Sequence, residues 1–164
     1  MRVALLIALV LAATAAPAAG AIRVDDRLTF TRTDGTPVAF PPKLRVFCGP
    51  WAGDVPVRAI HVRIGGRHGR WQLDAVLADV RGGRVVRLPN AFVFDAPRGA
   101  LLFAGVGGIE ASSAEEEARG RIVFERARCG PRLRVRVRVE ATLGSEFSDG
   151  EPLVVRGTFA AAEV

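Results

Sequence analysis

A strict alternation of apolar and charged residues between Arg132 and Ala141 constrains the fold more than any other stretch of this chain. Successive side chains of a β-strand point to opposite faces, so a period of two predicts a strand with one buried and one solvated face. The apolar face carries Leu133, Val135, Val137, Val139 and Ala141, and the charged face carries Arg132, Arg134, Arg136, Arg138 and Glu140.

Weaker alternation of the same kind recurs along the rest of the chain. It predicts further short strands over 27–33, 43–48, 57–64, 70–79, 84–88, 90–95, 100–104, 121–126 and 153–159. Asp34-Gly35 is typical of a hairpin turn, since glycine tolerates the positive φ that such turns need. About ten short strands with frequent turn residues indicate an all-β fold, an antiparallel β-sandwich, with a closed β-barrel as the alternative.

Helical signals are weak. Ser113-Ala114-Glu115-Glu116 resembles a capping box with Gly120 as the stop, so we expect at most one short helix there, or else a charged surface loop. Gly105-Val106-Gly107-Gly108 lacks the strand–helix context of a phosphate-binding loop and is interpreted as an ordinary loop.

The first 21 residues have the pattern of a secretory signal peptide. Arg2 precedes an apolar run from Val3 to Ala13, and small residues follow as far as Ala21. The run is about half the length of a membrane-spanning helix, so a retained anchor is the weaker interpretation. We expect cleavage before Ile22, a single β-domain over 22–164, no transmembrane segment after cleavage, and a periplasmic or extracellular location.

The chain is basic, with 23 Lys and Arg against 17 Asp and Glu. Without Arg2 the balance is 22 − 17 = +5, and Lys43 is the single lysine. The preference for Arg, Ala, Gly and Val is typical of a GC-rich bacterial genome. The arginine excess therefore has two alternative explanations, the codon usage of the genome and a role in anion binding.

Cys48 and Cys129 are the two cysteines of the chain. An even number of cysteines in an exported domain predicts a disulfide, with two free thiols as the alternative. A catalytic thiol needs a neighbouring histidine and an electropositive site, and neither cysteine has such a neighbour in the sequence.

Residues suited to catalysis or metal binding are few. His61 and His68 fall on opposite strand faces and are too few for a zinc site, so we expect solvated histidines, no metal and no cofactor. Glu146, Asp149 and Glu151 cluster near the C-terminus, and Asp25-Asp26 lie near the start. These carboxylates keep a carboxylate-dependent hydrolase as an alternative, although we expect no catalytic residues.

The arginines of the 132–141 strand are the remaining candidate site. Arg132, Arg134, Arg136 and Arg138 would form a row of guanidinium groups able to bind phosphate or sulfate, unless acids such as Glu125 on the next strand neutralise them. We therefore expect a non-enzymatic envelope module, with an anionic envelope polymer or a protein as partner and no nucleic acid. A barrel that binds an apolar ligand is the alternative, because Ala75, Ala141 and Gly157 would leave space inside.

Overall fold

A computed structural model describes residues 22–40, 44–51, 57–66, 69–90, 97–130 and 132–163. Several sequence predictions fall outside these ranges: the signal peptide over 1–21, His68, Lys43 and all but the first residue of the strand expected over 90–95.

The described residues form twelve strands and one short helix. Every strand pairing is antiparallel, which confirms the predicted all-β fold with at most one short helix. The elements are β1 (Ile22–Asp26), β2 (Thr29–Arg32), β3 (Pro37–Val38), β4 (Leu44–Pro50), β5 (Arg58–Gly66), β6 (Gly69–Val76), α1 (Leu77–Val80), β7 (Arg84–Leu88), β8 (Ala100–Val106), β9 (Ile109–Ser112), β10 (Arg119–Arg128), β11 (Arg134–Ser145) and β12 (Leu153–Glu163).

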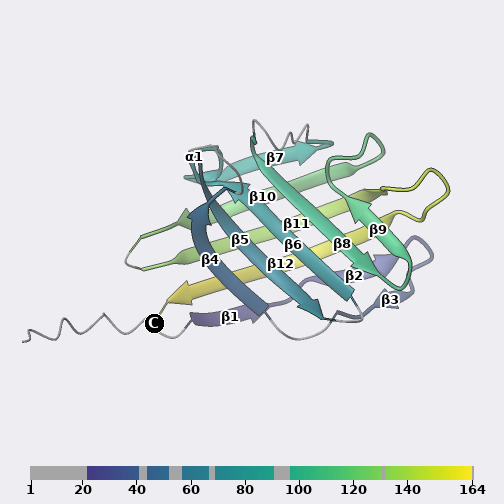
Figure 1. Ribbon diagram of the computed structural model, residues 1–164, viewed down its shortest axis with the longest axis horizontal. Helices are drawn as coiled ribbons and strands as arrows, with labels where there is room; N and C mark the ends of the chain where they lie inside the picture. Colours follow the sequence, from purple (N-terminus) through teal and green to yellow (C-terminus); the bar gives the residue numbers. More distant parts are fainter. Residues whose placement is uncertain are drawn as a thin grey trace, which may run out of the picture.

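The strands belong to one sheet that curls into a half-barrel, so that two parts of the sheet lie face to face. The rear half contains β7, β10, β11 and β12, together with β1, β2 and β3. The front half runs in the order β9-β8-β6-β5-β4. Pairing of Gly144 and Ser145 with β9 joins the halves on one side. Figure 1 shows β4, β5, β6 and β8 crossing in front of β10, β11 and β12.

Apolar side chains from both halves fill the space between them. The ring of Trp71 lies 5.6 Å from that of Phe30 and 6.2 Å from that of Phe159, measured between centroids, so an indole of the front half packs on two phenyl rings of the rear half. Fully buried side chains of the same core include Ile60, Val62, Leu73 and Leu102 from the front half and Ile122, Val137 and Val155 from the rear half.

The alternating segment folds as predicted from Arg134 onwards. Along β11 the arginines and Glu140 are exposed while the valines between them are buried. The strand prediction was wrong at Arg132, which lies in a bend before β11 begins. The predicted row of four strand arginines is therefore a row of three.

The predicted hairpin turn at Asp34-Gly35 connects β2 to β3. Gly35 has φ +87°, and the Arg32 amide donates a hydrogen bond to the Thr36 carbonyl at 2.8 Å. The Asp34 carboxylate accepts a hydrogen bond from the Thr36 amide at 2.8 Å, which lowers the pKa of Asp34.

A break between β1 and β2 lets both strands pair with β12. The Arg27 amide donates to the Thr158 carbonyl at 2.9 Å in this break. Gly157, opposite it, has φ +125°, and a Cβ atom there would lie 2.1 Å from the Arg27 carbonyl oxygen. A glycine is required at this position for both reasons.

The helix lies at a different place from the one predicted, which corrects the capping-box interpretation. Residues after β9 form turns, and the Ser113 hydroxyl accepts a hydrogen bond from the Leu102 amide at 2.9 Å. Ser113 thus holds β8 and does not cap a helix. The observed α1 directly follows β6 and buries Leu77 and Val80. Among the described residues no helix is long and apolar enough to cross a membrane.

Cys48 of β4 and Cys129, which directly follows β10, form the predicted disulfide. The two residues are 81 positions apart in the sequence and pack, partly buried, against the core. Because β4 is an edge strand of the front half and β10 belongs to the rear half, the bond crosslinks the two halves.

Candidate functional site

The outer surface of the rear half gathers arginines from three strands. The register places Arg23 of β1, Ala162 of β12 and Arg134 of β11 side by side in one row across the sheet. The next row contains Asp25, Ala160, Arg136 and Arg126, in that order. Arginines therefore stand on both sides of β12, while the β12 positions between them carry only methyl groups.

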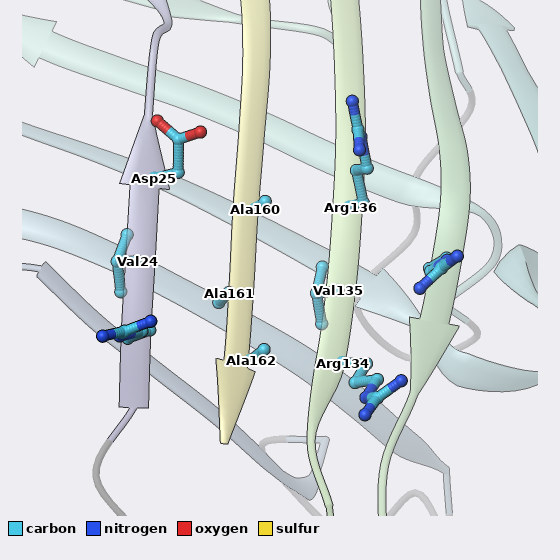
Figure 2. A pocket seen from close by; sticks show the side chains of 10 residues that line it. Val24, Asp25, Arg134, Val135, Arg136, Ala160, Ala161 and Ala162 are labelled. Carbon is cyan, nitrogen blue, oxygen red and sulfur yellow. The ribbon is translucent and has the colours of Figure 1, made fainter. Parts of the chain in front are cut away.

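This arrangement forms a trough of about 550 Å³ on the sheet surface, which we call the arginine trough. Figure 2 shows Arg134 and Arg136 on one side, Asp25 on the other, and the short side chains of Ala160 and Ala162 between them. The charged residues that line the trough are Arg23, Arg126, Arg134, Arg136 and Asp25.

Acidic neighbours neutralise only part of the trough. The Nε atom of Arg136 lies 2.9 Å from an oxygen of Glu125, and Arg138 lies 3.8 Å from the other oxygen of the same carboxylate. Asp25 binds Arg27, with 3.1 Å between Nε and Oδ1. Within the described residues, Arg23, Arg126 and Arg134 have no acidic partner, so their guanidinium groups remain available to an anion.

The sequence singled out only two of these four arginines. Arg134 and Arg136 line the trough, whereas Arg132 and Arg138 do not. Arg23 and Arg126 were missed because they lie on other strands. Only the register places Arg126 beside β11 and Arg23 across β12 from it. The expected pairing with Glu125 is confirmed, and it occupies Arg136 and Arg138 rather than Arg134.

His61 is buried, which corrects its expected position in solvent. On β5 it alternates with the buried Ile60 and Val62 and therefore lies on the other face of the strand, where it is buried as well. The imidazole Nδ1 lies 2.7 Å from Asp74 Oδ1, and Arg63 Nη1 lies 2.5 Å from the same oxygen. The ring stacks on Phe47 with 4.9 Å between centroids.

The His61 cluster lacks the parts of a catalytic dyad. The second ring nitrogen, Nε2, faces the Pro50 carbonyl oxygen at 3.3 Å. Nucleophilic catalysis would require a hydroxyl or thiol at that nitrogen. No serine, threonine or cysteine of the described residues is hydrogen-bonded to His61, and we interpret the cluster as structural.

The clustered carboxylates on which a hydrolase would depend interact with different neighbours. Glu151 binds Arg32, across the hairpin region of the rear half. Glu146 lies near Glu110 and Glu115, and burial together with these two charges raises its pKa. No group of three or more His, Cys, Asp and Glu in the described part of the chain is arranged to hold a metal ion.

An apolar cavity of about 490 Å³ lies between β1–β3 of the rear half and β4–β6 of the front half. Its walls include Leu28, Phe30, Phe40, Leu44, Ile64 and Trp71. Ala75 and Ala141, the small residues expected to leave space inside, are instead packed in the core.

The chain was compared with protein-family models, with curated proteins and with solved structures. None of the three comparisons finds a match. The candidate site therefore stands on its own geometry.

Proposed function

We propose that this protein is an exported bacterial β-module that binds anionic groups of an envelope polymer through the arginine trough and catalyses no reaction. The observation that carries the proposal is the convergence of four arginines from three strands on one trough. Three of them have no acidic partner among the described residues, and the alanines of β12 leave room between them.

The spacing of the charges suits a repeating anion. Adjacent strands lie roughly 4.8 Å apart, so Arg23 and Arg134, separated by one strand, lie about 10 Å apart at their backbones. Positions two apart on β11 are separated by about 6.5–7 Å. A guanidinium group binds phosphate or sulfate through two parallel hydrogen bonds, so such a grid favours a polymer with several anionic groups over a single ion.

The disulfide is typical of proteins in oxidising compartments, which supports the proposed export. The net positive charge steers anionic partners toward the trough, and this attraction weakens with salt. The same features support a binding protein better than a hydrolase, because Glu151, one of the clustered carboxylates, is bound to Arg32.

Retention on immobilised heparin, a sulfated polymer, tests the proposal. The trough variant is Arg23→Gln, Arg126→Gln, Arg134→Gln, which removes three exposed arginines without depriving any described acid of its partner. The matched control is Arg81→Gln, Arg84→Gln, Arg98→Gln, which removes the same charge from exposed positions outside the trough.

The trough variant is expected to elute at clearly lower salt than the control, with unchanged thermal unfolding of both. Because the two variants have the same net charge, a difference reflects the arrangement of the arginines and not the overall field. Equal elution of the two variants would overturn the proposal and leave the arginines as a solvated strand face.

A further inference from the structure

Two apolar hollows lie along the seam between β1 of the rear half and β4 of the front half. One is the cavity of about 490 Å³ described above, and the other is a groove of about 320 Å³. Val24 and Leu44 line both. The hollows are therefore neighbouring parts of one elongated apolar path, which suits a linear chain better than a compact ligand.

Three large apolar side chains at the rim of this path are exposed to solvent. Ile22, Val24 and Phe47 line the groove and are 44%, 40% and 46% exposed. The cavity floor is formed by Phe30 and Trp71, which are 6% and 1% exposed. A contiguous exposed apolar patch that leads to buried rings is typical of a binding groove.

One acidic group restricts the charge of a ligand inside the cavity. Among the described residues, Asp26 is the only titratable side chain that lines it. Partial desolvation raises the pKa of the Asp26 carboxyl, and the nearby charge of Asp25 adds to this effect, although the hydrogen bond from the Leu28 amide opposes it. A second negative charge beside Asp26 is disfavoured for the same reasons, so an acidic head group has to lie outside the cavity.

Cationic side chains lie outside the cavity in two places, Arg45 in the groove and the arginines of the trough. Val24 lines the trough as well as the two hollows. Within the described chain β1 pairs only with β12, so its other edge is open. Arg23 and Asp25 line the trough while Asp26, on the alternate face of β1, lines the cavity. A ligand that crosses the free edge of β1 thus passes from the arginines to the apolar path.

We propose that the β1–β4 seam binds a single-chain anionic amphiphile, with its hydrocarbon chain in the cavity and its acidic head on Arg23 and Arg134. The charge complementarity decides this occupant: exposed arginines, Arg45 of the groove and those of the trough, lie outside the cavity, and apolar walls with one disfavoured carboxylate lie within it. The inference rests on the proposed anion binding by the trough and adds the apolar part of the ligand.

The test uses the fluorescence of Trp71 in a Trp51→Phe background, where Trp71 is the single tryptophan. Two probes share one chain length: ω-bromoundecanoate, which is anionic, and ω-bromoundecanol, which is neutral. Bromine quenches the indole only at close contact. We expect saturable quenching by both probes, and tighter binding of the carboxylate than of the alcohol.

Two variants separate the chain site from the head site. Leu44→Glu places a charge in the apolar path and should weaken the binding of both probes about tenfold or more. Val85→Glu, at an exposed valine of β7, is the control and should leave the binding of both probes unchanged. Arg23→Gln, at an exposed position, should weaken binding of the carboxylate and not of the alcohol.

Absence of Trp71 quenching by either probe would overturn the inference. If Arg23→Gln weakens the binding of both probes equally, or of neither, the inference is also overturned, because the head group would then not lie on the arginines. Heparin retention of the same proteins is measured in parallel. Retention without quenching leaves the proposed function standing while the amphiphile site fails.

Discussion

His61 and Asp74 form a buried pair on the outer face of the front half, with 2.7 Å between Nδ1 and Oδ1 and side chains only 8% and 5% exposed. The pair spans adjacent strands, since His61 on β5 stands opposite Asp74 on β6. Arg63, on the same face, shares the carboxylate at 2.5 Å. One acidic group thus satisfies two nitrogen donors where water is largely excluded.

Asp74→Leu is expected to lower the free energy of unfolding by about 3–5 kcal/mol, because it leaves the buried His61 nitrogen without its acceptor. The double variant His61→Phe, Asp74→Leu removes both members and keeps a ring beside Phe47. Its loss should be smaller than the sum of the two single losses by more than about 1 kcal/mol. Urea unfolding of the four proteins measures this coupling, and additive losses would contradict it.

Alternation predicts a strand most clearly where the two faces of the strand differ in burial over a long run. β11 is the clearest case, since each arginine on it is exposed and each valine buried. β1, β3 and β9 were not predicted. All five residues of β1 are exposed, and β3 is only two residues long, so neither produces a periodic signal. Pairing with β12 and β2 makes them strands.

Side-chain burial beyond one face could not be predicted, because it depends on contacts distant in the sequence. His61 lies on the strand face opposite to Ile60 and Val62, as alternation requires. Ala59 and Val76 lie on the same face as His61 and are also buried. The arginine trough has the same origin: Arg23 and Arg134 meet across Ala162 only through the register of three strands. The Cys48–Cys129 pair was predictable because the chain offers one pairing.

Removal of the disulfide should destabilise the protein strongly. The bond closes a loop between residues 81 positions apart, and the chain-entropy model gives about 4–5 kcal/mol for a loop of that size. Cys48→Ala, Cys129→Ala should show this loss in urea unfolding relative to the oxidised wild type. Wild-type protein with reductant should match the double variant, and an unchanged midpoint in both would contradict a stabilising crosslink.

Gly157→Ala should be more harmful than an alanine at another glycine of positive φ. Gly157 has φ +125°, and a Cβ atom there would meet the Arg27 carbonyl at 2.1 Å. Gly82, with φ +72°, has no atom within 4 Å of its Cβ position and serves as the matched control. Both changes carry the backbone cost of about 1 kcal/mol, and only Gly157→Ala adds a collision with backbone. Equal melting temperatures of the two variants would contradict the close approach of the β1–β2 break to β12.

Glu146 provides a prediction about pH, because partial desolvation of its carboxyl and the charges of Glu110 and Glu115 raise its pKa above the ordinary value of 4.5. A raised carboxyl pKa means that the folded protein holds the proton at pH values where the unfolded chain has released it. The stability contributed by this group therefore falls as pH rises from the unfolded pKa through the folded pKa, and it stays reduced above that range.

Glu146→Gln removes the unfavourable charge and should stabilise the protein at neutral pH by up to about 0.5 kcal/mol, the range expected for an exposed position. Near pH 3 the wild-type carboxyl is protonated, so the difference should vanish.

Glu140→Gln is the control of opposite sign, because the hydrogen bond from Arg121 lowers the pKa of Glu140. That variant should lose stability at neutral pH, and the loss should become smaller as pH falls toward and through the lowered pKa of Glu140. Thermal unfolding at both pH values decides, and destabilisation by Glu146→Gln at neutral pH would show that Glu146 contributes a favourable interaction in its charged form.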